Sequence, residues 1–159
     1  MKLKLALAAG VALLAVPAFS SASAQAANMY VSGGYSSFDG NGATIGGITG
    51  RLGVGFTPNL GIEGEATFGV DDDNGLELDN EFGVFGVGRI PVSEQFDVFA
   101  RVGWARIETD PGNDEDGLAY GVGGDFYFTP NDGIRADFTR HDYDAGDVDQ
   151  WSLSYVRRF

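Results

Sequence analysis

The feature that most constrains the fold of this chain is a two-residue alternation of apolar and polar side chains. It is clearest in residues 60–70, where apolar residues such as Ile62 and Phe68 alternate with polar residues such as Glu63 and Thr67. Successive side chains of a β-strand point to opposite faces, whereas a helix would mix these residues on its faces. The segment is therefore predicted to be a strand with one apolar and one polar face.

Seven further segments repeat this pattern, so the chain is predicted to contain eight strands. Residues 82–90 depart from it, because Phe82 and Val84 lie on one face while Phe85 and Val87 lie on the other. The orientation of that strand is left open. The predicted strands are residues 29–37, 48–56, 60–70, 82–90, 96–104, 118–128, 134–140 and 151–159.

The connections between these segments alternate in character. Residues 57–60, 91–95 and 129–133 are short and contain proline, which presets φ for a tight turn. Residues 39–46, 71–79, 107–117 and 141–149 are longer, polar and acidic. Outer-membrane barrels have this asymmetry, with short turns at the periplasmic end and long loops at the extracellular end.

The apolar faces of the strands need a cover, and no helical pattern in residues 27–159 supplies one. The cover is then either a second sheet, as in a soluble sandwich, or lipid. In lipid every backbone donor and acceptor must be paired within the protein, so the sheet has to close. We therefore predict an all-β fold, an eight-stranded antiparallel up-and-down transmembrane β-barrel.

Aromatic residues mark both ends of the predicted strands. Girdles at the two interfaces of a membrane barrel have this arrangement, whereas in a soluble sandwich these would be ordinary strand-end aromatics. Phe56, Phe96, Phe128 and Phe159 lie at the short-turn end, and Phe68, Trp104, Tyr120, Phe138 and Trp151 lie toward the long-loop end.

The first residues have the features of a secretory signal peptide. A basic start is followed by a 12-residue apolar stretch over residues 5–16, too short to span a membrane as a helix, and then by small residues. We predict cleavage after Ala26, which leaves residues 27–159 as the barrel domain; a cut after Ala24 is the alternative.

The predicted mature chain is strongly acidic. Cleavage removes both lysines, so eight arginines face 23 carboxylates and the formal net charge is −15. This balance excludes a nucleic-acid partner, which requires a basic surface. The chain also has no cysteine, which excludes disulfides and cysteine-based metal sites.

The last nine residues, Trp151–Phe159, end on an aromatic residue and carry Leu153 and Tyr155 on the same alternating face. They resemble the C-terminal strand of outer-membrane proteins, which the barrel-insertion machinery recognises through its terminal aromatic. That resemblance implies the insertion machinery as a partner through Phe159. Arg157 departs from the pattern because it lies on the outward face.

Several other stretches resemble the small outer-membrane β-barrel family, the porin-like group related to the OmpA and OmpX barrels. They are residues 30–36, 83–89, 96–104 and 117–123. The resemblance covers the whole predicted mature chain. It implies a Gram-negative outer-membrane protein in contact with lipid and lipopolysaccharide, and we expect a monomer. The family has no single shared activity.

Charged residues on the polar faces are predicted to lie inside the barrel. An eight-stranded barrel is only wide enough for side chains to fill, so these charges must pair with one another. A plug of ion pairs is the main interpretation, and a gated conductance through rearranged pairs is the alternative. The set is Arg51, Glu63, Glu65, Arg101, Asp125, Arg135 and Asp137, with Arg89 as a further candidate.

His141, the only histidine, and the acidic loops are the remaining candidates for chemical sites. A lipid-modifying enzyme would need a serine nucleophile beside His141, but Ser152 and Ser154 are predicted to point inward. We therefore expect a solvated strand-end histidine. The loop carboxylates do not match an EF-hand; they are expected to be solvated, with divalent bridging to lipopolysaccharide phosphates as a minor hypothesis.

These considerations predict a structural or surface-interaction role in envelope integrity, adhesion or stress resistance. The alternatives are a small porin-like channel and, less favoured, a lipid-modifying enzyme. No catalytic, cofactor-binding or metal-binding residue is assigned, no cofactor is expected, and the protein is predicted not to be an enzyme.

Overall fold

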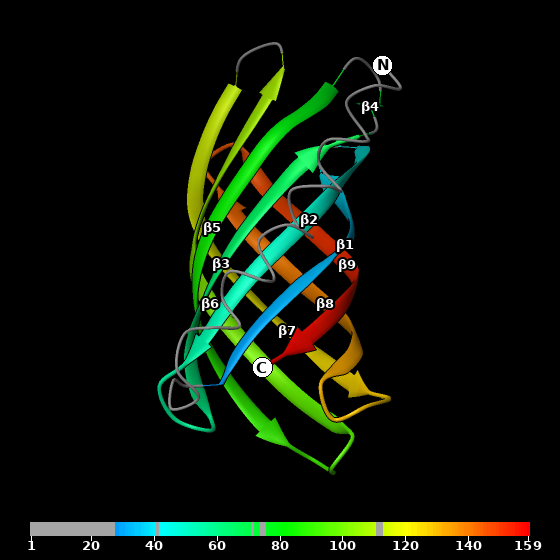
Figure 1. The fold of residues 1–159 in the computed structure, drawn as a ribbon. Coiled ribbons are helices and arrows are strands. Elements are labelled where there is room, and N and C mark those ends of the chain that lie inside the picture. The colour runs from blue at the N-terminus through cyan, green and yellow to red at the C-terminus, as the bar shows by residue number, and fades with distance from the viewer. Residues whose placement is uncertain (1–27, 41, 71, 74–75, 111–112) are drawn as a thin grey trace.

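The computed structural model describes residues 28–159 except 41, 71, 74–75 and 111–112. The predicted signal peptide therefore lies outside the described residues. The described chain forms one antiparallel sheet whose tilted strands wrap around a common axis (Figure 1). The strands are β1 (Met29–Gly40), β2 (Ala43–Gly55), β3 (Leu60–Gly69), β4 (Asp72–Asp73), β5 (Leu76–Pro91), β6 (Phe96–Asp110), β7 (Asn113–Tyr127), β8 (Asp132–Tyr143) and β9 (Gly146–Arg158).

The sheet is closed, as predicted. Each long strand pairs with the next along the chain, β1 pairs with β9, and β3 pairs with β5. The two-residue β4 only extends the edge of β5 and takes no place in the circle. The described residues therefore confirm an eight-stranded antiparallel barrel, and among them no helix is long and apolar enough to cross a bilayer.

The outer face of the barrel is apolar. Residues 82–90, whose orientation the sequence left open, turn Phe82 and Val84 outward and bury Phe85 and Val87 in the lumen. The aromatic residues predicted at the short-turn end are all exposed on the outside. At the other end Phe68, Trp104, Tyr120 and Trp151 are exposed as well, and Phe138 packs beside Trp151 with ring centroids 4.7 Å apart.

At the end of the barrel opposite the short turns, the acidic connections are shorter than the sequence predicted. Strands cover most of residues 39–46, 107–117 and 141–149. Gly146, with a φ of 141°, helps to close the turn between β8 and β9. Backbone pairing does not require apolar side chains, and outside the bilayer both faces of a hairpin can be polar. Cross-strand contacts such as Arg106 to Asp114 at 3.0 Å support the extended hairpins.

The short turns share one local design. In the turns at Thr57 and Thr129 the threonine hydroxyl accepts backbone N–H bonds from the residues two and three positions later. The Asn59 and Asn131 side-chain amides then donate to a backbone carbonyl of the neighbouring strand, each at 2.9 Å. Side-chain hydroxyls replace backbone acceptors in this way at many turns. The repeated sequence thus fixes the strand register at this end.

One glycine creates room for the interior. Gly53 faces the lumen, and a Cβ atom placed there would lie 2.0 Å from the ring of Tyr30. With glycine at that position, the Tyr30 ring lies against the Gly53 backbone and its hydroxyl reaches Glu63 at 2.5 Å. A larger residue would displace the ring, so this glycine belongs to the interior packing.

Candidate functional site

The lumen of the barrel holds the charged residues that the sequence assigned to it. All seven residues of the predicted inward set are buried, and each is at most 5 % exposed. Arg89, the further candidate, also points inward, and 16 % of its side chain is exposed. Alternation along the strands therefore identified the interior correctly.

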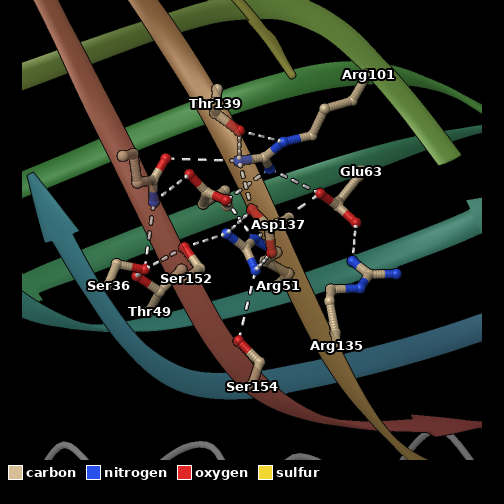
Figure 2. A network of polar contacts seen from close by, with 12 residues as sticks. Ser36, Thr49, Arg51, Glu63, Arg101, Arg135, Asp137, Thr139, Ser152 and Ser154 are labelled. Atoms are coloured by element: carbon tan, nitrogen blue, oxygen red, sulfur yellow. Dashed lines mark hydrogen bonds and ion pairs between the residues drawn. The ribbon is translucent and has the colours of Figure 1, made fainter. Parts of the chain in front are cut away.

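Arg51 on β2 and Asp137 on β8 connect opposite parts of the wall (Figure 2). The guanidinium of Arg51 donates to both carboxylate oxygens of Asp137, at 3.0 and 3.2 Å. It also donates to Glu65 on β3 and to Ser152 on β9. One side chain thus joins four strands across the lumen.

Arg101 on β6 and Arg135 on β8 complete the network from the other side. Arg101 donates to Glu63 at 2.9 Å, to Glu65 at 2.6 Å, and to the Thr139 hydroxyl. Arg135 donates to the second oxygen of Glu63 at 2.7 Å and to both oxygens of Asp125 at 2.7 and 3.1 Å. Because Glu63 is shared by two arginines, the ion pairs form one continuous network.

Hydroxyl and amide groups continue this network toward the long-loop end. The Ser36 hydroxyl lies 2.6 Å from both the Thr49 and the Ser152 hydroxyls, and Thr49 lies 2.8 Å from Thr67. The amide of Gln150 donates to Ser36 and to Glu65, each at 3.3 Å. These contacts satisfy buried polar atoms that the lumen cannot hydrate.

An apolar cluster covers the network at the long-loop end. Phe38, Ile107 and Tyr143 are each at most 6 % exposed, and Ile45 and Val148 pack against them. The three buried members come from β1, β6 and β8, so the cluster bridges the lumen rather than lining one wall. Charged pairs and apolar side chains together fill this part of the interior.

The prediction that His141 is a solvated strand-end residue was wrong. His141 is fully buried, because β8 continues past it to Tyr143 and both side chains point inward. Its Nε2 lies 3.0 Å from the Gln150 side-chain oxygen, and its Nδ1 lies 3.1 Å from the Tyr143 hydroxyl. Within the described chain its hydrogen-bond partners are Gln150 and Tyr143 and not a serine, so the nucleophile–base pair of a hydrolase is not formed there.

Sequence reasoning missed Glu81, which lies on the inner wall of β5 between Thr67 and Ile107. It is completely buried, and within the described part of the chain neither of its oxygens has a hydrogen-bond partner. The signal was present, because Glu81 shares the parity of Phe85 and Val87. It was not used, because the strand was predicted to begin only at Phe82.

Three further arginines lie on the outside. Arg106 pairs with Asp114, Arg140 pairs with Asp149 at 2.7 Å, and Arg157 pairs with Asp132 at 2.8 Å. Over the described residues, no group of three or more His, Cys, Asp or Glu side chains could hold a metal ion. The carboxylates of residues 71–73 lie outside the described side chains, so divalent bridging there stays a prediction.

The sequence matches the family described as the outer membrane protein beta-barrel domain over residues 6–159. The chain belongs to this family. Membership of this family indicates that the protein is located in the outer membrane of a Gram-negative bacterium. No curated protein sequence matches the chain.

Solved outer-membrane barrels share its fold. Ail, the attachment invasion locus protein of Yersinia pestis, solved with the heparin analogue sucrose octasulfate, is 21 % identical with a TM-score of 0.60, covering 84 % of this chain and 99 % of Ail. OprG from Pseudomonas aeruginosa is 11 % identical with a TM-score of 0.65, covering 84 % and 96 %. The N-terminal barrel of OprF from Pseudomonas aeruginosa is 16 % identical with a TM-score of 0.62, covering 85 % and 100 %.

Proposed function

We propose that this outer membrane protein beta-barrel has a structural and surface-interaction role and is neither a channel nor an enzyme. The observation that carries the proposal is the occupied lumen. Arg51, Arg101 and Arg135 each join carboxylates on other strands, and the cluster of Phe38, Ile107 and Tyr143 covers them. An ion entering from the long-loop end would have to displace both layers.

Planar-bilayer recordings test the closed lumen. We expect purified, refolded protein to produce no stepwise conductance, because opening a path requires separating buried ion pairs. The matched comparison is a triple variant, Phe38→Ala, Ile107→Ala and Tyr143→Ala, which removes the apolar cover. Reproducible single-channel steps from the wild-type chain would instead favour the porin-like alternative.

The acidic surface at the long-loop end favours a positively charged partner. Its exposed side chains include Asp116, Asp142, Asp144 and Asp147, while the two outward arginines there, Arg106 and Arg140, are already paired with carboxylates. A surface with this excess of carboxylates repels polyanions and attracts cations. Ail has been solved with a heparin analogue, which is a polyanion, and we expect the opposite preference for this chain.

Binding of polylysine and of sucrose octasulfate to the protein in nanodiscs tests that preference. We expect polylysine to bind and sucrose octasulfate not to bind, with the polylysine affinity falling as salt is raised. A triple variant, Asp142→Asn, Asp144→Asn and Asp147→Asn, should weaken polylysine binding. Tight binding of sucrose octasulfate to the wild type would contradict the proposed partner class.

A further inference from the structure

A cavity of about 220 Å³ lies at the short-turn mouth of the barrel, at the opposite end from the apolar cover. Its lining includes the β2–β3 turn around Pro58 and Asn59, and three charged side chains from three other strands: Arg89 of β5, Asp97 of β6 and Arg158 of β9. The arginines and carboxylates of the central network do not line this space, although Tyr30, which donates to Glu63, does.

The two guanidinium groups at this cavity have unused donors. Arg89 directs Nη1 to Asp125 at 2.9 Å and to the Tyr127 hydroxyl at 3.3 Å, but its Nη2 is buried and has no hydrogen-bond partner in the described chain. Arg158 directs Nε to the Pro130 carbonyl at 2.7 Å. Asp97 lies 3.7 Å from Arg89 and 3.8 Å from Arg158, too far for a hydrogen bond to either.

Aromatic rings hold both guanidinium groups in place. Arg158 lies over the Tyr127 ring at 3.8 Å from its centroid, and Arg89 lies over the Tyr30 ring at 4.7 Å. Stacking of this kind restricts the side chain without occupying its N–H donors. The donors are therefore fixed in position before any ligand arrives.

Two of the three charged side chains that line the cavity are arginines, in an otherwise acidic protein. Asp97, the third, lies near both guanidinium groups without a hydrogen bond to either. A buried N–H donor without a partner is costly, and a charged donor more so. An anion in the cavity would bring hydrogen-bond acceptors to the guanidinium groups that line it.

We propose that this cavity, lined by Arg89 and Arg158, binds a small oxyanion, a carboxylate or a phosphate, on the periplasmic side of the membrane. A planar guanidinium donates two parallel hydrogen bonds to either group, and two guanidiniums at one cavity favour an anion over neutral ligands. The side of the membrane follows from the short turns, which are periplasmic in barrels of this family. The site goes beyond the proposed surface role.

Thermal unfolding of the refolded barrel in detergent micelles tests the site, with inorganic phosphate and succinate as separate probes. Sodium chloride at matched ionic strength is the reference, which removes general screening. We expect phosphate, succinate or both to raise the unfolding midpoint above that in chloride, and the two arms identify which anion class fits. Equal midpoints in all three salts would overturn the proposal.

Two neighbouring arginines provide the matched variants. Arg158→Gln removes a guanidinium from the cavity and should weaken anion binding by about tenfold or more, the size of a charge-assisted hydrogen bond. Arg157→Gln removes the same charge one residue away on the outer face, and should change the affinity by less than about twofold. Asp97→Asn removes the competing carboxylate and should strengthen binding. Equal weakening by Arg158→Gln and Arg157→Gln would show that only net charge matters, which would also overturn the site.

Discussion

Replacing Arg101 with methionine is expected to lower the free energy of unfolding of the barrel by about 3–5 kcal/mol. The side chain is almost completely buried and donates to Glu63, Glu65 and Thr139. Methionine fills similar space but leaves two carboxylates short of a counter-charge in a lumen that water cannot reach. Urea unfolding in lipid vesicles, followed by tryptophan fluorescence, measures the loss.

Arg106 provides the control on the same strand. It points outward, its side chain is 56 % exposed, and its ion pair with Asp114 is solvated. Arg106→Met should therefore cost less than about 1 kcal/mol. If the two variants lose the same amount, the central network does not stabilise the fold. Adding Glu65→Gln to Arg101→Met should recover part of the loss, because it removes one of the stranded charges.

The fold was predictable because lipid imposes a strict rule on the outer face. Every residue such as Val102 or Leu153 that faces hydrocarbon must be apolar or small, so the two-residue period stays visible along each strand. The same parity then places Arg51, Glu65 and Asp137 inside. The same two-residue pattern thus predicted both the fold and the charged interior.

The pattern fails where the strands leave the bilayer. Beyond the outer girdle both faces contact water or the closed lumen, so alternation no longer marks the strand and the acidic stretches were predicted as loops. His141 and Glu81 lie in these extensions. Strand parity could have placed both side chains on the inner face. The closure of the lumen above them by Phe38, Ile107 and Tyr143, which come from three strands, is a long-range contact with no local signal in the sequence.

Replacing Glu81 with glutamine is expected to raise the free energy of unfolding by about 1–3 kcal/mol, a change opposite in sign to most substitutions of buried charges. Glu81 is fully buried and lacks a hydrogen-bond partner in the described chain. On folding its carboxyl must leave water either as an ion or after binding a proton, and each route costs free energy. The amide has the same shape and carries no charge, so it avoids most of that cost.

Glu65→Gln is the matched comparison, because it makes the same chemical change on the same inner wall. Glu65 accepts hydrogen bonds from Arg51 and Arg101, so its loss should cost about 3 kcal/mol. Urea unfolding under identical conditions should therefore move the two variants in opposite directions. A loss of stability in Glu81→Gln comparable to that in Glu65→Gln would mean that Glu81 has a counter-charge in the membrane-embedded protein. Opposite signs would mean that the barrel tolerates an unpaired carboxyl beneath its apolar cover at the expense of stability.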